Sequence, residues 1–158
     1  MLDVDPLAIT SFGDVALRLG LATGLGLLLG LDREIAGADA GIRTHALVSL
    51  SSAMIMMSSL LLYASLRETS HAPDPLRALE GLAQAIGFIA AGLIFVRGNS
   101  VRNMTSAANI WIAAAIGIAC GAGQYVLVLT GSALALLLVV AVRLVERSFG
   151  SKTKTNDD

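Results

Sequence analysis

Charged and polar residues gather in two short segments of an otherwise apolar sequence. In the first, Asp32, Arg33 and Glu34 follow directly on one apolar run, and Arg43 opens the next. The second, residues 97–109, reads RGNSVRNMTSAAN and again places arginine, amide and hydroxyl side chains beside an apolar run. Arginines can pair with carboxylates at such places, or join amides and hydroxyls in binding a phosphate or carboxylate. The candidate functional polar cluster is Asp32, Arg33, Glu34, Arg43, Thr44, Arg97, Asn99, Arg102, Thr105 and Asn109.

Besides a phosphate or carboxylate site, two interpretations of this cluster stay open. Charges that flank a membrane span are routine, and arginines there contact anionic lipid head groups. The sharper hypothesis is that Asp32 or Glu34 pairs with Arg43, Arg97 or Arg102 across the two segments. Charges of opposite sign near lipid cost less together than apart.

The sequence predicts no metal site, no cofactor and no enzymatic activity. Asp32, Glu34 and Asp39 could offer oxygen ligands to magnesium, but the surrounding arginines disfavour a cation. Neither histidine has a companion at ligand spacing, and a single cysteine excludes a site of several thiolates. The sequence has no glycine-rich phosphate loop, no Cys/His pair and no Ser/His/Asp set.

The composition is that of an all-α, polytopic helical membrane protein. The mean hydropathy is +0.75, and 55% of the residues are hydrophobic. Only 15% are charged, against about 25% in ordinary soluble domains. A span needs about 20 mostly apolar residues. Apolar runs bounded by charge predict five transmembrane helices: Asp14–Leu31, Arg43–Tyr63, Leu79–Val96, Ser106–Ala122 and Gln124–Val142.

The connections between these spans predict an orientation in the membrane. The N-terminal residues lack the basic stretch of a signal peptide, so the first run is expected to be retained. Successive connections lie on alternate sides of the membrane, and this places eight of the eleven basic residues on one side. Because basic residues of short loops are enriched on the cytoplasmic side, we expect that side to be cytoplasmic. We therefore expect a periplasmic N-terminal segment (1–13), a transmembrane domain (14–143) and a polar cytoplasmic tail (144–158). Residues 67–80, with two prolines and several charges, are expected to form an outer loop.

Small residues at four-residue spacing predict close helix packing within the bilayer, where no hydrophobic effect drives helices together. Gln84 and Asn109 lie inside apolar runs, so each amide is expected to face a neighbouring helix. Arg18 lies one turn after Asp14 and is expected to pair with it. The predicted packing positions are Gly20, Gly24, Gly26, Gly30, Gly87, Gly92, Gly117 and Gly121.

Two stretches carry a family resemblance: GLLLGLDREIAGADAGIRTHALVSL (26–50) and AIGFIAAGLIFVRGNSVRNMTSAANIWIAAAIGIACGAGQY (85–125). Together they resemble the transmembrane domain of the MgtC/SapB family of bacterial inner-membrane proteins. Asp32 departs from a more frequent glutamate, and Ala85 and Ala90 replace common glycines. The chain is also expected to lack the cytoplasmic C-terminal domain of longer members. The matching positions are Gly30, Arg33, Glu34, Gly41, Arg43, Thr44, Gly87, Phe88, Gly92, Asn99, Val101, Arg102, Thr105, Ala107, Ala108 and Trp111.

The resemblance implies a role in adaptation to low magnesium and in survival inside host cells. One hypothesis is a regulator that docks against an inner-membrane protein partner. The alternative is a transporter or channel for magnesium or another small ion, with the cytoplasmic arginine and aspartate residues at its mouth. The expected surroundings are the lipid bilayer and either a protein partner or further copies of the chain in a homo-oligomer. No nucleic acid is expected.

The orientation can be tested by cysteine labelling after removal of the native Cys120. A cysteine at position 70, replacing Ser70, is expected to react with a membrane-impermeant reagent from the periplasm. A cysteine replacing Ser100 is expected to react only from the cytoplasm, because the two connections differ in span parity. Labelling of both positions from one side would contradict the five-span arrangement.

Overall fold

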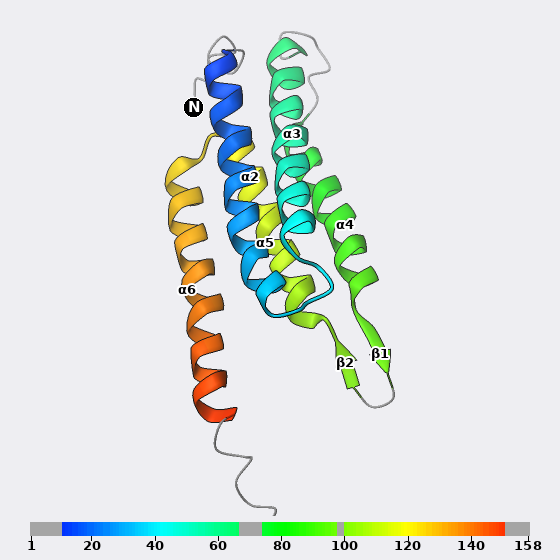
Figure 1. The fold of residues 1–158 in the computed structure, drawn as a ribbon. Helices are drawn as coiled ribbons and strands as arrows, with labels where there is room; N and C mark the ends of the chain where they lie inside the picture. Colours follow the sequence, from blue (N-terminus) through cyan, green and yellow to red (C-terminus); the bar gives the residue numbers. More distant parts are fainter. Residues whose placement is uncertain (1–10, 67–73, 98–99, 151–158) are drawn as a thin grey trace, which may run out of the picture.

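The protein is a bundle of helices (Figure 1). The structure is a computed structural model and describes residues 11–66, 74–97 and 100–150. Within these ranges, five helices are long and apolar enough to cross a membrane, which confirms the all-α, five-span prediction. The helices are α2 (Phe12–Ile35), α3 (Ile42–Leu66), α4 (Leu76–Leu93), α5 (Met104–Gly121) and α6 (Tyr125–Gly150).

Both ends of the predicted third span, Leu79–Val96, were wrong by a few residues. Helix α4 begins at Leu76, inside the predicted outer loop, because the Asp74 carboxylate accepts the Leu76 N–H at 2.9 Å and starts the first turn. It ends at Leu93, and strands β1 (Phe95–Arg97) and β2 (Ser100–Arg102) follow as an antiparallel hairpin in which Val96 pairs with Val101. Helix α6 continues to Gly150, and its part that is apolar enough to span a membrane ends at Arg143, beside the predicted end at Val142. Residues 67–73 of the expected loop lie outside the described ranges.

Helix α5 is the centre of the bundle and contacts each of the other four helices. Helices α2 and α3 pack against it and against each other, whereas α4 and α6 lie at opposite edges (Figure 1). The chain runs back and forth between the two ends of the bundle. The end of α2, the start of α3, the hairpin, the start of α5 and the end of α6 therefore meet at one end, here called the charged end (Figure 1). This confirms that the two polar segments share one face.

Four glycines allow α2 and α5 to approach α3 at backbone distance. A Cβ atom at Gly26 would lie 2.8 Å from the His45 carbonyl oxygen, and one at Gly30 would lie 2.6 Å from Ile42 Cα. On α5, Gly117 faces the backbone of Ser49 in the same way, and Gly121 faces that of Ala53. A side chain at any of these positions would push two backbones apart, so the three central helices depend on glycine here.

The other predicted packing positions do not serve this purpose within the chain. A Cβ atom at Gly20, Gly24, Gly87 or Gly92 would meet nothing within 4 Å, so none of these glycines lies against the backbone of a neighbouring helix.

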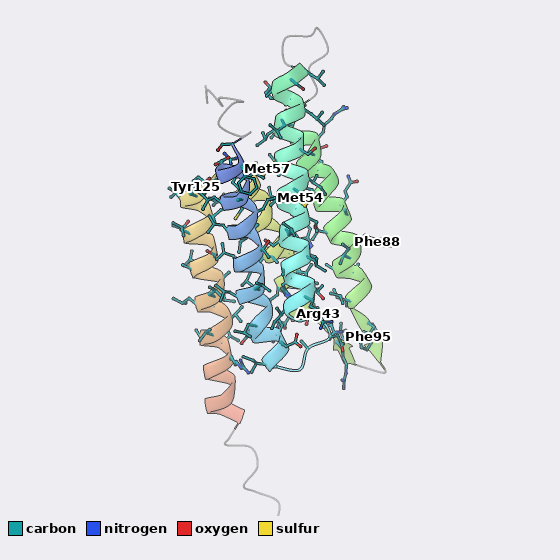
Figure 2. The ribbon with its side chains drawn as sticks, turned by 45° about the horizontal axis from the view of Figure 1, so that its top comes forward. Arg43, Met54, Met57, Phe88, Phe95 and Tyr125 are labelled. Atoms are coloured by element: carbon teal, nitrogen blue, oxygen red, sulfur yellow. The ribbon has the colours of Figure 1, made fainter. Side chains whose placement is uncertain are left out.

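Helix α4 shows which of its faces packs against the bundle and which does not. It packs through Leu82, Ile86 and Ala90, one turn apart, so Ala90 occupies the packed face with its methyl group in place. Gln84 is exposed on the other side, contrary to our expectation, and Phe88 is 83% exposed there and points outward (Figure 2).

The end opposite the charged end is held by polar contacts between α2 and the α5–α6 turn. The Arg18 guanidinium pairs with Asp14 at 2.7 Å, as predicted, and donates to the Gly121 carbonyl at 3.0 Å. The Tyr125 hydroxyl donates to the same Asp14 carboxylate at 3.2 Å, at this end of the bundle (Figure 2). Gly123 supplies the positive φ of +72° that the tight turn requires.

Replacing Gly117 by Ala should destabilise the protein, and replacing it by Leu should do so further, because α5 must then move away from Ser49. Overpacking of this kind costs about 1–3 kcal/mol. The readout is the thermal midpoint in detergent. The matched control is Gly87→Ala, in open space on α4, where better helix propensity should leave the midpoint unchanged or raise it. Equal effects at the two positions would show that the α3–α5 contact does not limit stability.

Candidate functional site

A cavity of about 670 Å³ lies between α2, α5 and α6 at the charged end. Asp32 and Arg33, near the end of α2, line it together with Thr105 and Asn109 from the first turns of α5. Arg143 of α6 closes the group. Four members of the predicted polar cluster are therefore brought together here, and their helices fix them because α2 and α5 pack directly on each other.

Asp32 is the centre of this group. Its Oδ1 accepts a hydrogen bond from Arg143 Nη1 at 2.8 Å, and its Oδ2 lies 3.6 Å from Arg33 Nε. The Asp32 side chain is only 12% exposed, so the pair with Arg143 is largely removed from water. Among the described residues, Asp32 pairs with neither Arg43 nor Arg102, and its partner from another helix is Arg143 of α6. The side chain of Arg97, the third predicted partner, lies outside the described residues.

Arg143 was missed as a site residue although the sequence held a signal for it. The alternation of spans had already placed its basic side chain on the same face as Asp32. What could not be read from the sequence is the rotation of α6, which turns Arg143 towards α2 instead of towards lipid.

The two polar segments do contact each other, but through Asp39 and Asn103. The Asn103 amide donates to Asp39 Oδ2 at 2.7 Å and to the Leu93 carbonyl at 3.2 Å. Asn103 has a φ of 64°, a left-handed conformation that asparagine tolerates better than most residues. This residue therefore ties the end of α4 and the start of α5 to the α2–α3 connection. The sequence reasoning overlooked it.

Glu34 contributes to the start of α3. Its Oε2 accepts the Ile42 N–H at 3.1 Å, and His45 Nδ1 lies 2.8 Å from the Gly41 carbonyl oxygen one turn later. Glu34 thus satisfies a backbone donor that the helix start leaves free. No described arginine forms an ion pair with it.

The remaining predicted residues that the structure describes do not line this cavity. Arg43 and Thr44 line a second hollow of about 560 Å³ with Glu34 and Asp39, and Figure 2 shows Arg43 at the charged end. Arg102 is exposed on β2 and lines neither hollow. The side chain of Arg97 and the whole of Asn99 lie outside what the structure describes.

The α2/α5/α6 cavity has more donors than acceptors. Arg33 Nε and Asn109 Nδ2 are buried without a hydrogen-bond partner, and two guanidinium groups share one carboxylate. Such a site suits an anion better than a cation. Among the described residues, no group of three His, Cys, Asp or Glu side chains could hold a metal ion. The three acids once considered for magnesium are divided between the two hollows.

Comparison with known proteins gives one consistent relationship. A family model described as the MgtC family matches residues 19–148. The chain is 38% identical over 112 residues to the putative magnesium transporter YhiD of Escherichia coli, covering 70% of this chain and 52% of that protein. It is 36% identical over 120 residues to protein SapB of Bacillus subtilis, covering 71% and 49%.

A third relative is protein MgtC of Salmonella typhimurium, which is 37% identical over 109 residues, covering 69% of this chain and 44% of that protein. The chain spans about half the length of the curated relatives it matches. No solved structure matches the chain. Since the family model covers most of the sequence, with four spans in full and most of the first, the chain belongs to the MgtC family and is a multi-pass protein of the bacterial inner membrane.

Proposed function

We propose that this protein serves adaptation to low magnesium by regulating a partner in the inner membrane, and that it does not carry the ion itself. The link to magnesium comes from the family and from a relative named as a putative magnesium transporter. The regulatory role is the part that the geometry supports.

The observation that carries this proposal is the apolar core between the two polar ends. One buried cluster takes residues from α2, α3, α5 and α6, each at most 5% exposed, and includes Ala22, Ala113, Ile116, Cys120 and Val128. The cluster lies between the Asp32 group at the charged end and the Asp14–Arg18 pair at the other. A hydrated ion crossing here would lose its water to side chains that offer no ligands, which is costly in a bilayer.

The outward face of α4 supports a partner within the bilayer. Gln84 is exposed there beside Phe88. An amide that faces lipid lacks the hydrogen bonds that water would provide, and a neighbouring transmembrane helix can supply them. A protein partner or a second copy of the chain would meet this need.

A flux measurement separates regulation from transport. Purified protein in proteoliposomes with an internal magnesium indicator is expected to give no uptake above protein-free vesicles, because the apolar core blocks a hydrated ion. An ionophore added at the end verifies that the indicator responds. Saturable magnesium uptake that depends on the protein would overturn the proposal and favour the transporter hypothesis.

The Asp32–Arg143 pair is expected to matter for function and stability. Asp32→Asn should lower membrane levels and growth in low magnesium more than Asp74→Asn, since Asp74 is exposed and asparagine can still cap α4. In a double-mutant cycle, Asp32→Asn and Arg143→Gln should be coupled by about 1–2 kcal/mol, because either change alone leaves a largely buried charge unpaired.

Arg102→Gln provides the matched control for this cycle, since Arg102 is exposed at the same end of the bundle. Its effect should add to that of Asp32→Asn. Additivity of Asp32→Asn with Arg143→Gln as well would mean that the ion pair contributes no coupling of its own.

A further inference from the structure

The cavity between α2, α5 and α6 is amphipathic. Asp32, Arg33 and Arg143 line one part of it, and Ile112, Leu138, Val139 and Val142 line another. Three of these apolar side chains remain well exposed, with Ile112 at 41%, Leu138 at 63% and Val142 at 49%. All three belong to the membrane-spanning parts of α5 and α6, so the apolar part of the cavity opens towards the acyl chains of the bilayer.

The charged part of the cavity carries a net positive charge, because two arginines and one aspartate line it. Arg143 Nη1 donates a hydrogen bond to Asp32 Oδ1 at 2.8 Å. Arg33 Nε lies 3.6 Å from Asp32 Oδ2, which is too long for a hydrogen bond. The Arg33 side chain is only 16% exposed, and its Nε has no hydrogen-bond partner. A guanidinium left in this state beside hydrocarbon is costly, and an anion would relieve the cost.

A second buried donor lines the same cavity. Asn109 is 7% exposed, and its Nδ2 has no acceptor. Thr105 adds a hydroxyl from the preceding turn of α5. A group that satisfies Arg33, Asn109 and Thr105 together needs several acceptor oxygens and a negative charge. A phosphate diester has both, and arginine is well suited to it.

We propose that this cavity binds an anionic phospholipid, with its phosphate at Arg33 and Asn109 and an acyl chain along Ile112 and Leu138. The volume of about 670 Å³ lies in the range of ordinary ligand pockets. In a lipid with a neutral glycerol head group, the negative charge of the phosphate is not neutralised within the lipid, so it can balance the charge of Arg33. A zwitterionic lipid would bring an ammonium group towards two arginines. This inference does not rest on the regulatory role proposed above.

The test uses the full chain, purified in neutral detergent and titrated with phosphatidylglycerol or phosphatidylethanolamine of matched acyl chains. Lipid retention is measured by native mass spectrometry. Phosphatidylglycerol should bind about tenfold more tightly. Arg33→Gln should weaken its binding about tenfold or more, the effect of losing one charge-assisted hydrogen bond. Ile112→Trp, which fills the apolar part of the cavity, should weaken it similarly.

Two variants outside the cavity serve as controls. Arg102→Gln removes an exposed positive charge at the same end, and Leu134→Trp enlarges an exposed side chain of α6. Both should bind phosphatidylglycerol as the unaltered protein does. The thermal midpoint of each variant shows whether it is folded. If Arg33→Gln does not fold, the test is the comparison of phosphatidylglycerol binding by Ile112→Trp with that by Leu134→Trp.

Three results would overturn the proposal. The first is equal retention of the two lipids, or equal effects of the cavity variants and their controls. The second is displacement of the lipid by millimolar inorganic phosphate together with unchanged binding in Ile112→Trp, which would identify a soluble anion as the ligand. The third is a co-purifying protein that Ile112→Trp releases while lipid retention is unchanged, which would assign the cavity to a partner helix.

Discussion

The close approach of α2 and α5 to α3 is the contact on which the rest of the structure depends. Lipid is as apolar as the side chains, so helices in a bilayer associate through packing and hydrogen bonds. Gly26 and Gly30 bring α2 to the backbone of α3, and Gly117 and Gly121 bring α5 there. His45, Ser49 and Ser52 are fully buried on the side of α3 that receives them, and Ser49 lies against both Gly26 and Gly117. The three helices form one unit, and α4 and α6 are added to it.

Helix α6 is joined to that unit in a different way. In its membrane-spanning part only 11% of the residues are buried, against 61% in α5, so packing alone fixes it weakly. Polar contacts with α2 secure it near both ends, through Tyr125 and Asp14 on one side and Arg143 and Asp32 on the other. Between these contacts the two helices touch little. The cavity at the charged end follows from this arrangement, since Arg143 reaches across to Asp32 while the neighbouring side chains of α6 leave space.

The apolar core and the charged end support different proposals. The apolar cluster around Ala22, Ala113 and Cys120 offers no ligands to a hydrated ion, and the buried Ser49 of α3 is packed tightly against Gly26 and Gly117, which supports regulation of a partner over transport. The charged end combines fixed arginines, a buried amide and an apolar wall open to lipid, which supports recognition of a lipid phosphate. A lipid held there would contact α2, α5 and α6 together at the charged end.

The sequence by itself determined the five helical spans, the shared end of the two polar segments and the Asp14–Arg18 pair. Each follows from hydropathy, span parity or spacing along one helix, which are local properties. The tertiary structure alone decided which faces of the helices meet. Gly26 and Gly20 have the same side chain, yet only Gly26 faces α3, and Gln84 points outward while Asn109 points inward. The partner of Asp32 is likewise 111 residues away on α6. Rotation of a helix about its axis depends on all its neighbours together, and no single stretch of sequence contains that information.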